Sequence, residues 1–341
     1  MASPPEKPAD RGAQWRELTR SLVLALVVVG VVLGSLFAYA RTWPPMVAVE
    51  SSSMQHAAGE SAFGPIDTGD LVIVQAVTSR TEVVTYLEGR AAGYLTYGDY
   101  GDVLVFRDPL DLQGTAFIHR ALAYVAWNET LGGYDVPDLG RLNASEWEAW
   151  GETGLPTTQP YALSRFLLHR AGWRQDLDVH VNLTAGDLRI PVNLGSSGFL
   201  TMGDRNAYTT RTKFDRWVVP PPYILGKARG EIPWFGLIKL TLLREGAGCC
   251  DGWGSTDPDT GAAANSWLAL DLVLVALVGI PAAFTIVEFY LGRHPGARER
   301  VRAAWSRLWR RTSEPPQAEA ATPAGQKEGQ GREQTGEKPE P

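Results

Sequence analysis

Residues 101–106 read Gly-Asp-Val-Leu-Val-Phe, and residues 69–74 read Gly-Asp-Leu-Val-Ile-Val. Each is a short, continuous, valine-rich apolar run that starts at a glycine and an aspartate. Runs of this length and composition, bounded by residues that favour turns, are typical of buried β-strands. The sequence therefore predicts a mainly β domain, with a helix in the stretch 161–170. Further segments with strand-like composition are 116–122, 199–202, 223–225 and 237–242.

Two long apolar stretches flank these strands. Residues 21–40 carry no charge and, as a helix, would be about 30 Å long, which matches the hydrocarbon core of a bilayer. Residues 267–291 are similarly apolar, with Asp271 near the start, Glu288 near the end and Pro281 inside. We expect both stretches to be transmembrane helices, because a buried helix is rarely this long and this free of charge. The alternative for the first stretch is a cleaved signal peptide, whose apolar core is shorter, roughly 7–15 residues.

The basic residues predict how the two spans are oriented. Lysine or arginine precedes the first span at positions 7, 11, 16 and 20, and arginines follow the second span between 293 and 311. Basic residues are retained on the cytoplasmic side of a membrane, so both termini are expected in the cytoplasm and residues 44–265 on the outer face of the cell membrane. Asn-X-Ser/Thr sequons at Asn128, Asn143 and Asn182 fit the outer side.

Composition divides the chain into segments with different expected roles. They are a cytoplasmic N-terminal segment (1–20), a first span (21–40), an outer β domain in two parts (44–122 and 191–244), an inserted subdomain (123–190), a linker (245–265), a second span (267–291), a basic cytoplasmic segment (292–311) and a tail expected to be disordered (312–341). The net charge of −6 and the isoelectric point near 5.5 argue against a nucleic-acid-binding protein.

The only cysteines of the chain, Cys249 and Cys250, are adjacent. An ordinary disulfide separates its two Cα atoms by more than neighbouring residues normally allow. We therefore expect a structural or inter-chain role for this pair, and the outer domain is not a disulfide scaffold.

A series of short motifs follows the first span in a fixed order. They are Ser51-Ser-Ser-Met54, Gly69-Asp-Leu-Val72, Gly101-Asp-Val-Leu-Val-Phe106, Phe117-Ile-His-Arg120, Gly198-Phe-Leu-Thr-Met-Gly-Asp-Arg-Asn206 and Gly226-Lys-Ala-Arg-Gly-Glu-Ile-Pro-Trp-Phe-Gly236. In this order the motifs resemble type I signal peptidases, in the branch shared by archaea and the endoplasmic reticulum. The resemblance covers roughly residues 20–240, with 123–190 unmatched. It implies an antiparallel, barrel-like catalytic β domain. The inserted subdomain, expected to be α/β, and the two transmembrane helices that hold the domain are expected from the sequence itself.

The resemblance assigns the chemistry to Ser53 and His119. The family's nucleophile is the serine immediately before methionine, and the histidine stands where the bacterial branch has a lysine base. The chemistry agrees, because a serine hydroxyl needs a base to become a nucleophile and neutral imidazole, with a pKa near roughly 6.5, suits that task. The resemblance also implies an oxyanion hole formed by the backbone N–H of Ser53 and the hydroxyl of Ser51. For Ser51 the alternative role is to cap a turn. We expect Met54 to contact the substrate.

Two aspartates are candidates for the carboxylate that supports His119, and the sequence does not decide between them. Asp204 belongs to the family's Gly-Asp motif and is the first candidate. The family usually has a second aspartate several residues later, where this chain has Thr209 and Thr210. Asp215 could take that role if the loop is longer, since a carboxylate is needed to orient the imidazole and stabilise the imidazolium.

The function implied by the resemblance is that of a membrane-bound serine endopeptidase. It would remove signal peptides from secretory preproteins after a small residue, without a metal or organic cofactor and without a nucleic-acid partner. The lipid bilayer surrounds the spans, and the second span is either an anchor or a contact to the protein translocation channel. Two alternatives stay open. One is an inactive relative with a binding or assembly role, suggested by the missing second aspartate and by the missing proline that the family has two residues after methionine. The other is a processing peptidase of narrower specificity.

Overall fold

The computed structural model describes residues 11–57, 59–108, 111–184, 187–188, 196–243, 249–256 and 261–313. The chain divides into two compact units between Leu274 and Val275, inside a long helix. The tail expected to be disordered lies outside the described residues from 314 onward, as do 191–195 and 244–248 at two of the predicted boundaries.

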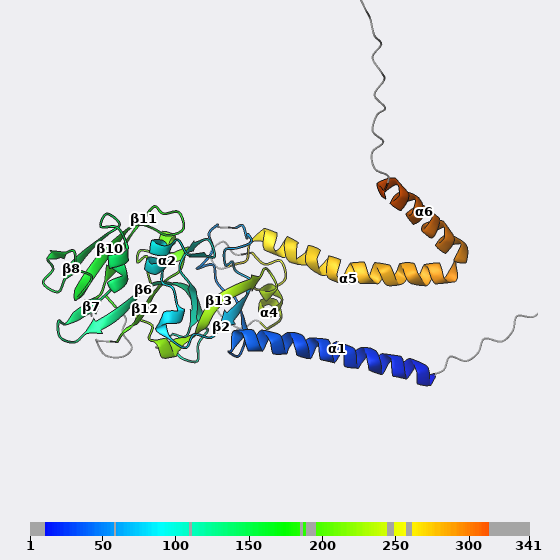
Figure 1. Ribbon diagram of the computed structural model, residues 1–341, viewed down its shortest axis with the longest axis horizontal. Helices are drawn as coiled ribbons and strands as arrows, with labels where there is room; N and C mark the ends of the chain where they lie inside the picture. Colours follow the sequence, from blue (N-terminus) through cyan, green and yellow to red (C-terminus); the bar gives the residue numbers. More distant parts are fainter. Residues whose placement is uncertain are drawn as a thin grey trace, which may run out of the picture. The chain divides into compact units, whose positions relative to one another are not determined.

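The first unit is built mainly from β-strands (Figure 1). The strands are β1 (Met46–Ala48), β2 (Leu71–Gln75), β3 (Leu95–Thr96), β4 (Asp99–Tyr100), β5 (Val103–Phe106), β6 (Phe117–Asn128), β7 (Gly133–Asp135), β8 (Trp147–Gly151), β9 (Pro156–Thr157), β10 (Leu163–Ala171), β11 (Leu177–Asn182), β12 (Gly198–Met202) and β13 (Ile224–Ile232). The helices of the two units together are α1 (Arg11–Ala40), α2 (Tyr86–Ala92), α3 (Asn206–Thr209), α4 (Gly236–Leu243), α5 (Ala264–Arg293) and α6 (Pro295–Ser313), with short 3-10 helices at Arg80–Glu82, Pro137–Arg141 and Pro221–Tyr223.

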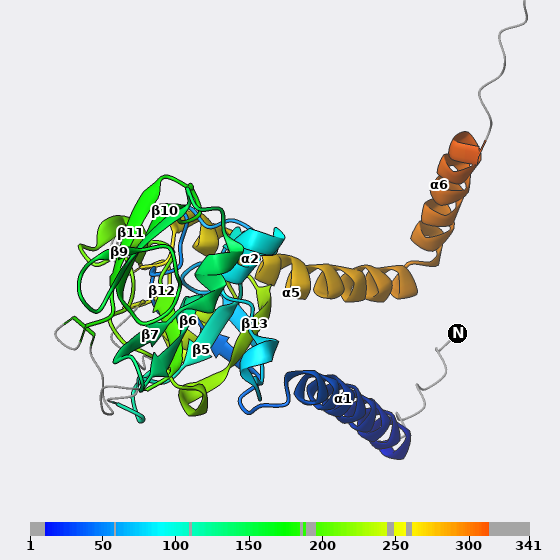
Figure 2. The same cartoon turned by 60° about the vertical axis from the view of Figure 1, so that its left-hand side comes forward.

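One antiparallel sheet connects the outer β domain with the predicted insert. Its strands follow the order β1-β2-β13-β5-β6-β7-β10-β8-β9, with β12 paired to β6 and β11 to β10. The long strand β6 joins the two parts, because its start pairs with β5 (Leu104↔His119) and its end pairs with β7 (Trp127↔Tyr134). Figures 1 and 2 show β7, β10 and β11 at one end of the unit and β13 at the other. The insert therefore extends the sheet that carries His119.

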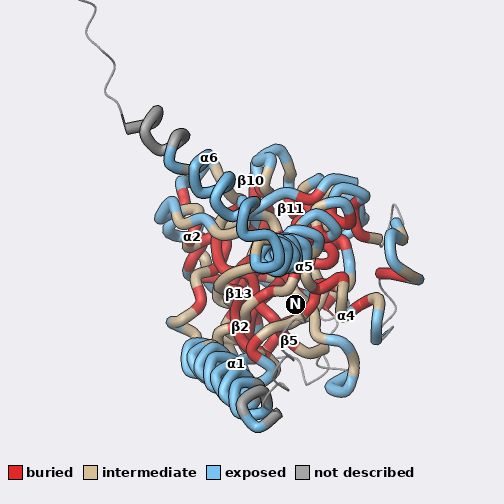
Figure 3. Tube along the Cα trace, turned by 90° about the vertical axis from the view of Figure 1, so that its right-hand side faces the viewer, coloured by how far each residue is buried: buried red, intermediate tan, exposed pale blue. Residues whose placement is uncertain are grey.

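The core lies along the strands and beneath the segment that carries Ser53. Buried residues are concentrated in the strands, whereas α1 is exposed along nearly its whole length (Figure 3). One hydrophobic cluster holds Val49 and Met54, on either side of the serines, against Val72 of β2 and Val103 of β5. Burying each large aliphatic side chain contributes about 1.5–3 kcal/mol, so this cluster anchors the serine segment to the sheet.

The coarse prediction of an antiparallel β domain with two long apolar helices is confirmed. Strands β2, β5, β6 and β12 occur where the sequence predicts them. α1 from Trp15 to Ala40 and the whole of α5 are each long and apolar enough to cross a membrane.

Two local predictions are wrong. The stretch 161–170 lies mostly in strand β10 and not in a helix, because both edges of this segment are paired: Phe166 lies opposite Ala149 of β8 and Val181 of β11. Within its described residues the insert is therefore β and not α/β. The stretch 237–242 lies in helix α4 and not in a strand, because Leu237 and Leu240, three residues apart, share one buried helix face.

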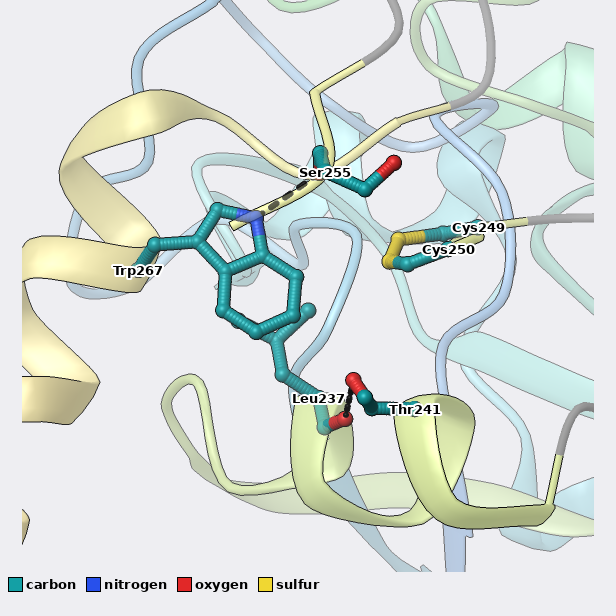
Figure 4. Close-up of a disulfide and its surroundings, with 6 residues drawn as sticks. All are labelled: Leu237, Thr241, Cys249, Cys250, Ser255 and Trp267. Atoms are coloured by element: carbon teal, nitrogen blue, oxygen red, sulfur yellow. Dashed lines mark hydrogen bonds between the residues drawn. A yellow bond between two sulfur atoms is a disulfide. The ribbon is translucent and has the colours of Figure 1, made fainter. Parts of the chain in front are cut away.

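Cys249 and Cys250 form a disulfide with each other, which agrees with the structural role expected for the pair and not with the inter-chain one. The peptide bond between them is cis and their Cα atoms lie 3.2 Å apart. The disulfide packs in a cluster with Leu237 of α4 and Trp267 of α5 (Figure 4). Part of the predicted linker therefore belongs to the core.

We predict that Gly226→Ala destabilises the β domain and that Gly230→Ala, in the same strand, does not. A Cβ at Gly226 would overlap the carbonyl oxygen of Gln75 on β2, whereas a Cβ at Gly230 would meet only Ile73, at 3.5 Å. Overpacking of this kind costs about 1–3 kcal/mol. Thermal unfolding of the detergent-solubilised protein should give a lower Tm for Gly226→Ala alone. Equal midpoints for the two variants would contradict this packing of β13 against β2.

Candidate active site

Strand β6 directs two neighbouring side chains to opposite faces of the sheet, since successive side chains of a strand alternate. His119 lines a pocket, and Arg120 enters the interior. Only 4% of His119 and none of Arg120 is exposed. The rings of Phe106 and Phe117 lie 6.4 and 5.9 Å from the imidazole, centroid to centroid, so aromatic packing limits how the ring of His119 can turn.

Asp215, the second candidate from the sequence, is the carboxylate that contacts His119. Nδ1 of His119 lies 2.6 Å from Oδ2 of Asp215, and the hydroxyl of Thr201 donates to the same oxygen at 2.6 Å. An ionised carboxylate only accepts hydrogen bonds, so Nδ1 carries the proton of the neutral ring. This leaves the lone pair of Nε2 available as a base.

Ser53 and His119 line the same pocket, which has a volume of about 290 Å³. Its walls come from two segments far apart in the sequence, residues 48–51 after β1 and residues 115–118 at the start of β6. Val49, Phe117 and Ile118 give these walls a largely apolar surface. The sheet therefore brings the predicted nucleophile and the predicted base to one apolar recess.

Gly203 lies between the backbone of Ser53 and the ring of His119. A Cβ at this position would come within 2.9 Å of the carbonyl oxygen of Ser53 and 3.0 Å of Nε2 of His119. The residues that follow fix Ser53, because its carbonyl oxygen accepts hydrogen bonds from the backbone N–H groups of Arg205 at 2.9 Å and Asn206 at 3.4 Å. The turn at 203–206 thus determines how Ser53 stands beside His119.

Ser51 and Met54 are placed differently with respect to the pocket. The hydroxyl of Ser51 donates to Oγ of Ser53 at 3.3 Å and lines the pocket, which is close enough to reach an oxyanion formed at Ser53. Met54 is only 1% exposed and packs with Ile66 and Val72. Its side chain is part of the core, contrary to the expectation that it contacts the substrate.

Asp204, the first candidate from the sequence, forms a buried ion pair beside the pocket. Arg120 binds its carboxylate twice, Nε to Oδ1 at 2.8 Å and Nη2 to Oδ2 at 2.6 Å. His56 donates to Oδ2 from Nε2 at 2.9 Å. Burial alone would raise the pKa of Asp204, but the charge of Arg120 and these hydrogen bonds hold that pKa below its ordinary value. Asp204 is therefore a structural group held in its charged form at neutral pH, and its pairing with Arg120 and His56 was not identified from the sequence.

The electrostatics of His119 favour its protonated form. Burial in itself would lower the pKa of His119, but the charge and hydrogen bond of Asp215 outweigh burial and raise it above the ordinary value. The interaction between His119 and Asp215 also makes the stability of the fold depend on pH. Its stabilisation is complete below the unfolded-state pKa of the histidine and is lost as the pH rises through the higher folded-state pKa. Among the described residues no group of three His, Cys, Asp or Glu side chains could hold a metal ion.

We predict that Asp215→Asn lowers the pKa of His119 below its wild-type value. Asparagine removes the negative charge that opposes the burial of the imidazolium, so the effect of burial dominates. Histidine side-chain NMR across a pH titration measures this shift. Asp187→Asn is a suitable control, since Asp187 is about half exposed and its ion pair is with Arg216, at 3.8 Å. An unchanged titration of His119 in Asp215→Asn would refute the proposed pairing.

We predict that Asp204→Asn lowers the free energy of unfolding by about 3–5 kcal/mol at neutral pH, because it leaves the buried charge of Arg120 unpaired. Asp187→Asn removes an exposed ion pair and should cost at most about 1 kcal/mol. Since the folded-state pKa of Asp204 is lowered, its stabilisation is present above the unfolded-state pKa and is lost as the pH falls through the folded-state pKa. Denaturant titrations at pH 7 measure the free energy of unfolding of the wild-type protein and of both variants. Similar losses in the two variants would contradict the structural role of Asp204.

No family model matches the chain, and no curated protein is significantly similar to it. The site is therefore defined by the geometry of this chain itself: a serine and a histidine in one apolar pocket, an aspartate on the far nitrogen of the histidine, and a buried ion pair beside them.

Proposed function

We propose that the protein is a membrane-anchored serine endopeptidase that removes signal peptides from secretory preproteins after a small residue. The observation that carries the proposal is the arrangement of three side chains: Asp215 binds Nδ1 of His119, and Ser53 lines the pocket beside that ring. The sequence motifs are compatible with this chemistry, because they contain Ser53 and His119 in the order found in type I signal peptidases.

In the proposed reaction Oγ of Ser53 attacks the carbonyl carbon of the scissile bond, and Nε2 of His119 takes the hydroxyl proton. Asp215 stabilises the imidazolium that forms. The oxyanion of the tetrahedral intermediate accepts hydrogen bonds from the backbone N–H of Ser53 and the hydroxyl of Ser51. His119 then gives its proton to the departing amine, which leaves an acyl-enzyme on Ser53. A water molecule, deprotonated by His119, hydrolyses this ester and restores Ser53.

The shape of the pocket supports an extended substrate with small apolar side chains. β1 stands at one end of the strand order, and the pocket lies between the segment that follows β1 and the start of β6. A peptide in extended conformation can add to such strand edges through its main chain, while alternate side chains enter pockets. The apolar walls at Val49 and Ile118 suit the small residues that precede the cleavage site of a signal peptide.

The position of Ser53 relative to α1 supports a membrane substrate. α1 ends at Ala40, and roughly a dozen residues separate this end from Ser53, which limits their distance to ~45 Å even in a fully extended chain. In the proposed topology α1 and α5 both span the cell membrane, both termini are cytoplasmic and the β domain stands on the outer face. A signal peptide leaving the bilayer would then meet the pocket close to the membrane surface.

We predict that Ser53→Ala and His119→Ala each lower the rate of preprotein cleavage at least about 1,000-fold, since the members of such a catalytic unit act together. His169→Ala is the matched control, because His169 is a partly exposed side chain of β10 that pairs with Glu148 and Asp178, and it should cleave at the wild-type rate. Full-length protein in detergent and several unrelated preproteins are used, with the new N-terminus identified by mass spectrometry.

Failure of the wild-type protein to cleave any of these preproteins would contradict the proposal and favour a binding or assembly role. Cleavage of only one class of preprotein would identify a processing peptidase of narrower specificity. Cleavage by Ser53→Ala would overturn the assignment of the nucleophile.

A further inference from the structure

The ring of His56 is enclosed on three sides. Its Nε2 donates to Asp204, and its face stacks on the indole of Trp173 with a centroid distance of 4.6 Å and an angle of 4° between the planes. At its Cε1–Nδ1 edge there is room only for a glycine, because a Cβ at Gly98 would come within 2.8 Å of Cε1 of His56. Nε2 of His56 is engaged by the carboxylate of Asp204, and its Nδ1 edge packs against Gly98, where a Cβ would come within 3.1 Å of Nδ1.

Trp173 belongs to the insert, in the connection between β10 and β11, whereas His56 follows Ser53 by three residues. The other interactions of Trp173 hold its ring in place: the guanidinium of Arg174 lies 4.5 Å from the indole, and Tyr208 lies 5.7 Å from it, centroid to centroid. The buried indole N–H has no hydrogen-bond partner among the described residues.

The hydrogen-bond partner of His56 is adjacent in sequence to a residue that binds the backbone of Ser53. Asp204, which accepts its hydrogen bond, precedes Arg205, whose backbone N–H holds the carbonyl oxygen of Ser53 at 2.9 Å. The guanidinium of Arg205 also donates to the hydroxyl of Ser52. His56 is thus attached at one face to the insert and at one nitrogen to the turn that holds Ser53.

We propose that Trp173 and His56 form a clamp through which the insert positions Ser53 against His119. The inference rests on the proposed peptidase function and gives the insert a role in it. Both residues are positioning residues, since they act through Asp204 and the turn at 203–206. Misplacement of a reacting atom by about 1 Å can lower a rate by about 100-fold, so loss of the clamp affects the chemical step more than substrate binding.

The first test compares steady-state cleavage of one preprotein by full-length variants. Trp173→Ala should lower kcat at least about 10-fold and leave KM within about two-fold. Trp173→Phe keeps an aromatic face for His56 and should recover most of kcat. Trp150→Ala is the control, because Trp150 is an aromatic residue of the same insert that packs against Arg165, and its kcat should equal that of the wild-type protein. Equal losses in Trp173→Ala and Trp150→Ala would overturn the proposal.

The second test is a double-mutant cycle between the two rings. Because both act through one contact, His56→Ala and the double variant with Trp173→Ala should have the same kcat, whereas independent residues would multiply their effects. Multiplied effects would refute the clamp. The Tm of each variant is measured beside kcat, so that rates are compared only at temperatures where the protein is folded. If the wild-type protein cleaves no preprotein, the proposed function fails; if it cleaves and Trp173→Ala matches it, only the clamp fails.

Discussion

The bidentate pairing of Arg120 with Asp204 is the constraint on which the arrangement of the site depends. A fully buried guanidinium is strongly disfavoured unless its charge is neutralised and its donors are bonded. Here the carboxylate of Asp204 supplies the charge, and the carbonyl oxygens of Thr96 and Asp99 are among those that accept from the remaining nitrogen, Nη1. Arg120 follows His119 in β6, and Asp204 lies in the turn that holds Ser53. One ion pair therefore connects the strand that carries His119 to the turn that binds the backbone of Ser53.

The two aspartates near His119 have different environments and therefore different tasks. The guanidinium of Arg120 holds the pKa of Asp204 below its ordinary value, so Asp204 is charged and can fix the geometry of the turn at neutral pH. Asp215 faces an imidazole whose protonation changes during the proposed reaction, and Thr201 supports it from β12. The surroundings of each carboxylate, and not its place in the Gly-Asp motif, decide that Asp204 is structural and that Asp215 is the one that stabilises the protonated imidazole in the proposed reaction.

The sequence was sufficient for the features that depend on composition and on local pattern. Valine-rich runs located β2 and β5, and the length of the apolar stretches located α1 and α5. It failed where neighbours in space decide. β10 is a strand because β8 and β11 pair with its two edges, and Cys249 bonds to Cys250 inside a core cluster that also contains Leu237 and Trp267. Neither feature can be inferred from hydrophobic pattern or from residue spacing.

In the site as well, the local sequence pattern was sufficient for some residues, and neighbours in space decided the others. The motifs placed Ser53 and His119 correctly in one pocket, but the choice between the aspartates depended on the path of the loop after Gly203. This loop contains α3 and returns to β12, where the backbone N–H of Asp215 donates to the carbonyl oxygen of Thr201 at 2.8 Å. A charged residue inside the apolar strand Phe117–Asn128 was the one signal in the sequence for the buried ion pair, since arginine is almost never fully buried without a partner.

The central claim is that Ser53 and His119 act on one substrate as nucleophile and base. The distance between Oγ of Ser53 and Nε2 of His119 in an experimental structure with a bound, non-cleavable substrate-like peptide tests this claim most directly. We expect hydrogen-bond contact, about 2.6–3.2 Å, with the carbonyl carbon of the peptide next to Oγ. Side chains that stay more than ~10 Å apart with the peptide bound would contradict it, because no proton could pass between them.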